Sequence, residues 1–171
     1  EAVVTILSED KTDFMAAVDE FFSTLRREYG FIEDGLVFKA EEISLPKTLL
    51  PEEIQDDLIN AVVACHNGVY RMIPDAPEVV ETSSNLSIVR TSEGLVEIQI
   101  LVRSSSETMK MALASELEST FALAGARVEF DGAYPGWEPN FKSDILNLMK
   151  KIYPQVTGKE ADVKMMHAGL E

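Results

Sequence analysis

The residue types that most often do chemistry are scarce in this sequence. It contains two histidines and one cysteine, which are His66, His167 and Cys65. A catalytic zinc site takes about three protein ligands, and neither histidine has a second ligand at HxxxH, HExxH or HxD spacing. Cys65 and His66 are neighbours on a predicted helix and therefore point in different directions, which argues against a nucleophile–base pair. We expect no complete metal site and no covalent nucleophile in this chain.

The two histidines differ in their surroundings. His66 falls in the last turn of a predicted helix, where a donor or a cation suits the free carbonyl groups, so a structural role is favoured. His167 leaves an apolar stretch beside Ala168 and Gly169, and a glycine lets the backbone approach a ligand closely. Glu171 follows two residues later. Either His167, Gly169 and Glu171 contact a substrate, or they are ordinary residues of an edge strand.

A second pair of candidates lies on two neighbouring predicted strands. Asn85 opens the stretch NLSIVR, and Arg103 closes QILVR. A planar guanidinium can hold a carboxylate through two parallel hydrogen bonds, and a carboxamide on the next strand can assist it. An arginine at the end of a strand is more commonly a solvated charge. From the residues alone, both interpretations stay open.

Hydrophobic periodicity predicts the elements that position these residues. Four helices are expected: residues 12–29, a helix that opens at Pro51 and ends before Asn67–Gly68, one between SSSE and Gly125, and one from about Phe141 to Thr157. The stretches with a strand pattern are AVVTIL, LVFKAEEI, VYRMI, ETSSNLSIVR, LVEIQILV, RVEFDGA and the final ADVKMMHAGLE. The turn TSEG between ETSSNLSIVR and LVEIQILV predicts a β-hairpin.

The order of these elements suggests an internal repeat. A strand, a serine-and-acid cap, a helix, a glycine stop and a second strand occur near the start and again after residue 95. The predicted fold is α+β, an antiparallel sheet with helices on one face and ferredoxin-like β-α-β units, with or without a true duplication. The pattern changes after Tyr134, because the helix and strand that follow do not repeat the earlier units. Residues 1–134 and 135–171 are therefore expected to belong to different domains.

Composition limits the partners. The chain carries 30 acids and 15 lysines and arginines, a net charge of −15, which disfavours nucleic acid and anionic membranes because both require a basic surface. No apolar run approaches the roughly 18 residues that span a bilayer. A single cysteine fits a reducing compartment.

The motifs VVETSSNLSIV, VEIQILVRS, LAGARVEFDGAYPGWEP and HAGLE closely resemble those of the bacterial aminoacyl-histidine (Xaa-His) dipeptidases, also called peptidase D. These are carnosinase-like, zinc-dependent metallopeptidases. The match covers most of the chain from about Val79 onward, whereas the earlier helices agree mainly in order and length. The resemblance implies a catalytic domain that carries two metals and an inserted lid, or dimerisation-type, domain.

By this resemblance, residues 1–134 are a lid truncated at its start, and 135–171 re-enter the catalytic domain. The zinc ligands and the general base would lie outside the chain, so the chain alone would be inactive. Asn85 and Arg103 match the pair that grips the substrate carboxylate in related enzymes, although Leu101 stands where the wider superfamily usually has an acid. His167, Gly169 and Glu171 match HAGLE and would face the substrate cleft.

The resemblance therefore predicts part of a cytoplasmic enzyme that hydrolyses dipeptides such as β-alanyl-histidine. This part would position the substrate carboxylate and close the cleft, and would hold no metal. The expected partner is a dipeptide, with no nucleic acid and no membrane. A homodimer through the lid or an exposed sheet edge is also possible. The alternative is a non-catalytic ferredoxin-like module for ligand binding or oligomerisation.

Overall fold

The structure is a computed structural model that describes residues 1–92 and 94–167. It divides into two units, Glu1–Leu49 and Leu50–Glu171, which are described separately. Gly169 and Glu171 lie outside the described residues.

The first unit is built around one long helix. A short 3-10 turn, η1 (Ser8–Asp10), leads into α1 (Lys11–Tyr29), which ends at Gly30 as the sequence predicts. The chain then returns along the helix. The ring of Phe38 lies 5.8 Å from that of Phe21 and 6.1 Å from that of Phe22, and Glu42 Oε2 accepts a 2.6 Å hydrogen bond from Lys11 Nζ.

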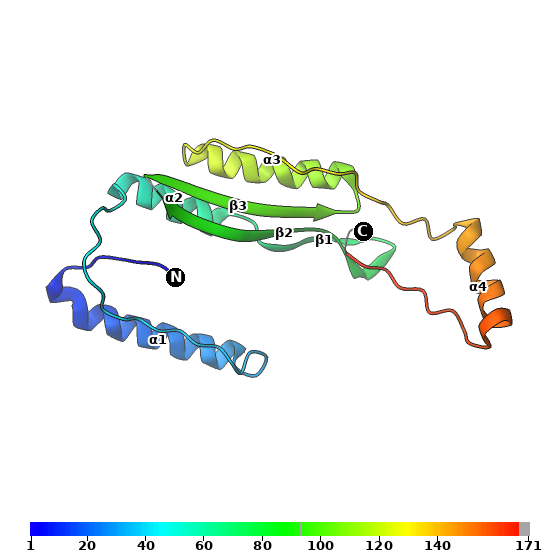
Figure 1. Ribbon diagram of the computed structural model, residues 1–171, viewed down its shortest axis with the longest axis horizontal. Coiled ribbons are helices and arrows are strands. Elements are labelled where there is room, and N and C mark those ends of the chain that lie inside the picture. The colour runs from blue at the N-terminus through cyan, green and yellow to red at the C-terminus, as the bar shows by residue number, and fades with distance from the viewer. Residues whose placement is uncertain (93, 168–171) are drawn as a thin grey trace. The chain divides into compact units, whose positions relative to one another are not determined.

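The second unit contains the sheet. Its elements are α2 (Glu52–Ala64), β1 (Gly68–Ile73), β2 (Ala76–Ser92), β3 (Leu95–Ser104), α3 (Glu107–Leu123) and α4 (Asp144–Thr157). The three strands are antiparallel in the order β1-β2-β3, and α3 runs alongside the β2–β3 hairpin (Figure 1). The predicted hairpin and α+β class are confirmed.

The core lies between the helices and one face of the sheet. Its buried side chains come from α2, the residue after it, and α3: Ala61, Cys65, Leu113, Leu117 and Phe121. Sheet residues packed against this cluster include Leu86, Ile98, Ile100 and Val102. Because side chains alternate between the two faces of a strand, their sequence neighbours point to the opposite face. The helices of the core thus cover one face of the sheet, as predicted. Residues such as Asn85 and Arg103 lie on the other face.

Several predicted strands are wrong. Residues 2–7, 36–43, 127–133 and 161–167 form no strand, since sheet pairing within the described residues is confined to β1, β2 and β3. The predicted β-α-β repeat is therefore not formed as strand–helix–strand. An alternating or apolar pattern supplies a face to bury, but a strand also needs a neighbour that pairs with its backbone.

What recurs instead is a helix followed by an extended return along it. In the first unit the return is held by the Lys11–Glu42 contact described above. In the second, Val128 packs on the core beside α3, and Lys110 Nζ then donates to the carbonyl of Tyr134 at 2.6 Å. Each return thus passes a lysine in the first turn of its helix, which gives the sequence repeat a structural counterpart.

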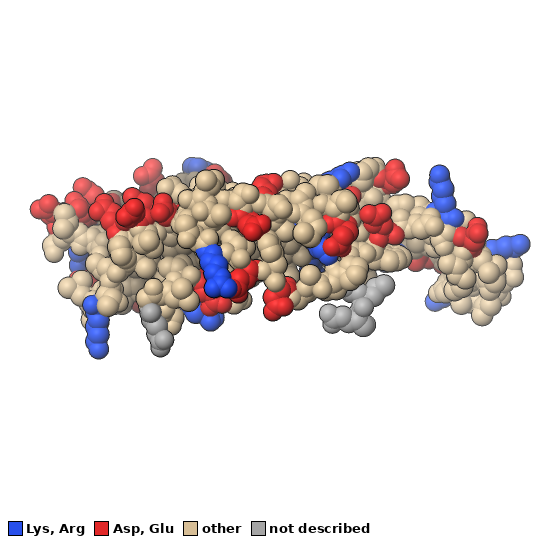
Figure 2. Space-filling model, turned by 90° about the horizontal axis from the view of Figure 1, so that it is seen from above, with Lys and Arg blue, Asp and Glu red and all other residues tan. Residues whose placement is uncertain are grey.

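The surface agrees with the acidic composition. On the face drawn in Figure 2, acidic side chains outnumber basic ones and the two are interspersed. None of the helices within residues 1–92 and 94–167 has the length and apolar character that a membrane span requires.

Candidate functional site

The register of the β2–β3 hairpin places the two predicted carboxylate-binding residues on one face. Ser83 pairs with Arg103, and Asn85 pairs with Leu101. Directly opposed residues of an antiparallel pair share a face, and Ser84, the residue between Ser83 and Asn85, is buried on the core side. Asn85 and Arg103 are therefore diagonal neighbours on the face opposite the helices, and both are exposed.

The side chain of Asn85 is engaged locally. Its Nδ2 donates to Ser87 Oγ at 3.1 Å, and that hydroxyl donates back to the carbonyl of Asn85 at 3.0 Å. The ladder is irregular here, with a register shift between Leu86 and Ile88. Asn85 thus shares a face with Arg103, but its amide is bonded toward Ser87 rather than toward the guanidinium.

His167 is brought to the same face by the returning chain. Its Nε2 lies 2.7 Å from Ser83 Oγ, and Ser83 is the ladder partner of Arg103. Burial lowers the pKa of His167, and the charge of Arg103 lowers it further, while a hydrogen bond to the backbone of Val80 opposes the shift. His167 and Arg103 also line the same open groove of the second unit, and Asn85 is not among the described residues that do so.

The charges around Arg103 leave its guanidinium available for an anion. The carboxylate of Glu81, two residues before Ser83, is buried and lies 3.6 Å from Arg71 Nη1. Within the described ranges, no acid forms an ion pair with Arg103. The guanidinium offers donors suited to a carboxylate, and the bonded pair of Ser83 and His167 lies beside it on the same face. The geometry therefore fits an anion-binding position.

Ser83 was missed by the sequence reasoning. It stands in the quoted stretch ETSSNLSIVR, two residues before Asn85. The only signal available was its spacing: once the hairpin register is known, Ser83 must face Arg103. Its contact with His167 joins residues 84 positions apart and has no local signature.

His66 has a structural role, as the sequence predicts, although it lies just beyond the helix rather than in its last turn. Ser84 Oγ donates to the carbonyl of His66 at 2.8 Å and lies 2.7 Å from His66 Nδ1. Because a serine hydroxyl has one hydrogen, Nδ1 must be the donor in the second contact. The ring also packs edge-on against Tyr70, 5.1 Å away.

Cys65 is buried beside this group. Its Sγ lies 3.4 Å from the carbonyl of His66, and burial raises the pKa of the thiol. A protonated, buried thiol is a poor nucleophile. Across residues 1–92 and 94–167, no three His, Cys, Asp or Glu side chains gather where they would hold a metal ion. The described residues thus do not fit a zinc site.

The second unit thus has an α+β fold in which α2 and α3 cover one face of the sheet and the polar Ser83–Arg103–His167 group lies on the other. Comparison with known proteins finds similarity to dipeptidases. The chain is 35% identical along its whole length to cytosol non-specific dipeptidase of Escherichia coli (strain K12), of which it covers 36%. The crystal structure of aminoacylhistidine dipeptidase from Vibrio alginolyticus matches 96% of the chain and 34% of its own length, with 33% identity and a TM-score of 0.91.

These similarities confirm the resemblance drawn from the sequence motifs: the chain is homologous to a segment of these dipeptidases. It spans about a third of the length of each relative. No protein-family model matches the chain.

Proposed function

We propose that this chain is the lid portion of an Xaa-His dipeptidase, and that Arg103 binds the free carboxylate of the substrate. The observation that carries the proposal is the Ser83–Arg103–His167 group, with its 2.7 Å Ser83–His167 contact, in a chain homologous to dipeptidases over its full length. Residues 1–134 would form the lid and 135–171 the return into the catalytic domain.

The contribution of this portion would be positioning. A guanidinium that fixes the carboxylate end of a dipeptide also fixes the distance from that end to the scissile bond, and closure over the substrate excludes water. Asn85, on the same sheet face, would assist after releasing Ser87. Gly169 and Glu171, which match HAGLE, would contact the substrate as well.

The whole protein would be a zinc-dependent, cytoplasmic hydrolase of dipeptides such as β-alanyl-histidine. By its homology to part of these dipeptidases, its metal ligands would lie outside this chain, and the chain alone would be inactive. The similarity to an enzyme named for the cytosol supports the compartment.

The test pairs a protein variant with a substrate variant. In the full-length protein that contains this chain, Arg103→Ala should lower kcat/KM for β-alanyl-histidine by roughly 10- to 100-fold, the range for a charge-assisted hydrogen bond. On β-alanyl-histidinamide, which lacks the carboxylate, the same variant should lose little. Arg90→Ala, an exposed arginine on the same hairpin, is the matched control. An equal loss on both substrates would refute carboxylate binding by Arg103.

An oligomerisation module remains the second candidate. Among the described strands β3 pairs only with β2, and its Leu95 and Leu101 are 68% and 49% exposed. An open strand edge can pair with a second copy. Sedimentation of the chain across a range of concentrations tests this directly. A monomer throughout would exclude a homodimer through this edge.

A further inference from the structure

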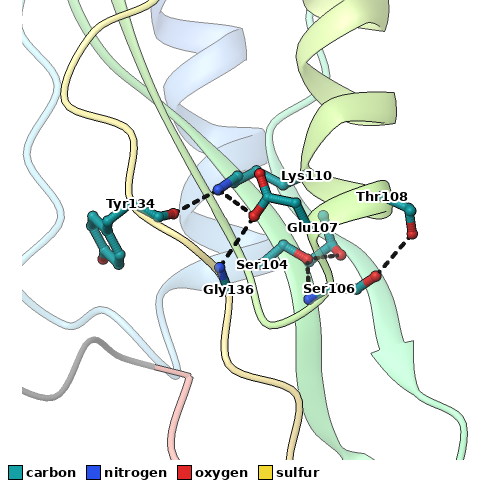
Figure 3. A network of polar contacts seen from close by, with 8 residues as sticks. Ser104, Ser106, Glu107, Thr108, Lys110, Tyr134 and Gly136 are labelled. Carbon is teal, nitrogen blue, oxygen red and sulfur yellow. Dashed lines mark hydrogen bonds and ion pairs between the residues drawn. The ribbon is translucent and has the colours of Figure 1, made fainter.

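Two side chains in the first turn of α3 hydrogen-bond the backbone of residues 134–136, at the predicted domain boundary. Lys110 Nζ lies 2.8 Å from Glu107 Oε2 and donates to the carbonyl of Tyr134 at 2.6 Å. The same Oε2 accepts the backbone N–H of Gly136 at 3.2 Å (Figure 3). We call Glu107 and Lys110 the clamp. Its two side chains hold a backbone donor and a backbone acceptor on either side of Pro135.

The contact is close and partly shielded from solvent. A Cβ on Gly136 would lie 2.6 Å from the carbonyl oxygen of Ser105 and 3.0 Å from that of Ser104, so only glycine fits. The side chain of Lys110 is 16% exposed. The hydrogen bonds from Lys110 and Gly136 lower the pKa of Glu107, which keeps its carboxylate ionised near neutral pH. The boundary is thus a packed junction and not a free linker.

The turn beneath the clamp is tied to the strand ends that carry the candidate site. Ser104, the residue after Arg103, bonds Thr82 through their hydroxyls at 2.8 Å, and its Oγ accepts the N–H of Ser106 at 3.1 Å. The N–H of Ser105 donates to the carbonyl of Glu81 at 3.1 Å. The clamp and Arg103 are therefore joined by one hydrogen-bonded turn.

The chain beyond the clamp leaves and then comes back to the same end of the sheet. It passes through α4 and returns at His167, which contacts Ser83, the ladder partner of Arg103. The segment between residues 136 and 167 is therefore fixed at both ends, at Tyr134–Gly136 by the clamp and at His167 by Ser83. Because the clamp fixes Tyr134–Gly136, it raises the effective concentration of His167 near Ser83.

The geometry points to Glu107 and Lys110 as positioning residues that return His167 to Arg103. They act through the backbone of Tyr134 and Gly136 and touch neither candidate ligand-binding side chain. This inference deepens the proposed function and rests on the assignment of Arg103 and His167 to its site.

The test uses the two histidines of the chain as internal probes. His167 reports the site, and His66, bonded to Ser84, reports the integrity of the sheet. By NMR, Lys110→Met and Glu107→Gln should speed hydrogen exchange of the Gly136 amide by roughly tenfold or more. The titration midpoint of His167 should move up toward that of an ordinary imidazole, since the ring leaves Arg103 and becomes hydrated. The ring signals of His66 should keep the chemical shifts that they have in the unaltered chain.

The matched control is Glu129→Gln, which removes a carboxylate from the exposed Arg127–Glu129 pair on the same returning segment. It should change neither probe. An unchanged His167 titration beside a faster-exchanging Gly136 would overturn the positioning role. Loss of the native chemical shifts of both histidine rings would overturn it too, because it indicates general unfolding. Because no step of this test depends on catalysis, its failure is distinguishable from failure of the Arg103 assay.

Discussion

His167 Nε2 lies 2.7 Å from Ser83 Oγ, although 84 residues separate the two in the sequence. Ser83 stands opposite Arg103 in the β2–β3 ladder. This contact carries the last described residue of the chain to the one face of the sheet that the core helices do not cover. It is the relationship on which the candidate site depends, and its consequences can be measured.

Docking of His167 should weaken on acidification. The pKa of His167 is lowered in the folded chain by burial and by Arg103, so over the range between the lowered and the ordinary value the undocked ring binds more protons. Docking is therefore favoured at a pH above the ordinary pKa of an imidazole. It weakens as the pH falls from that ordinary pKa toward the lowered pKa of docked His167. NMR signals of Ser83, followed from about pH 8 to pH 5, should show this transition. In His167→Gln the transition should vanish; its persistence would assign it to another group.

A bound carboxylate should reverse this pKa shift. A negative charge between Arg103 and His167 stabilises the imidazolium, so the pKa of His167 should rise when a dipeptide binds. The measurement is the His167 titration with β-alanyl-histidine and with its amide in parallel. Only the free acid should raise the midpoint, and Arg103→Ala should abolish the effect. An equal rise with the amide would mean that the carboxylate is not what the site holds.

Leu113→Ala should be strongly destabilising. Leu113 has no exposed surface and lies at the centre of the core between α3 and the sheet. Loss of its side chain removes apolar burial and leaves a cavity, which costs about 3–5 kcal/mol of unfolding free energy. Met111→Ala on the same helix is the control, because Met111 is 56% exposed. Urea unfolding followed by circular dichroism measures both, and similar losses would place Leu113 outside the core.

The thiol of Cys65 should resist modification in the folded chain. It is buried and its pKa is raised by that burial, so the thiolate is scarce and inaccessible. A thiol reagent should react slowly at pH 8 and rapidly in urea. Val63→Cys in a Cys65→Ala background is the matched control, since Val63 lies in the last turn of α2, two residues before Cys65, and is 81% exposed. Comparable native rates at the two positions would contradict the burial.

The helices and the hairpin of this fold can be predicted from the sequence. All four predicted helices form, because each combines an apolar stripe with a terminator within a few residues, as at Gly158, which adopts a left-handed φ of 71° after α4. The TSEG turn predicts the β2–β3 hairpin because it joins two stretches that have a strand pattern. Alternation along the hairpin places Asn85 and Arg103 together, and the quoted motifs identify the homologous dipeptidases.

Tertiary structure decided the remainder. RVEFDGA has the pattern of a strand, yet residues 127–133 run back along α3, since strand formation depends on a partner that no local pattern specifies. Ser83 gained its role from the hairpin register and from His167, and Gly136 from the clamp at Glu107 and Lys110. Such contacts join residues far apart in the chain. The sequence by itself therefore determined the elements and the homology, whereas packing alone decided which side chains meet.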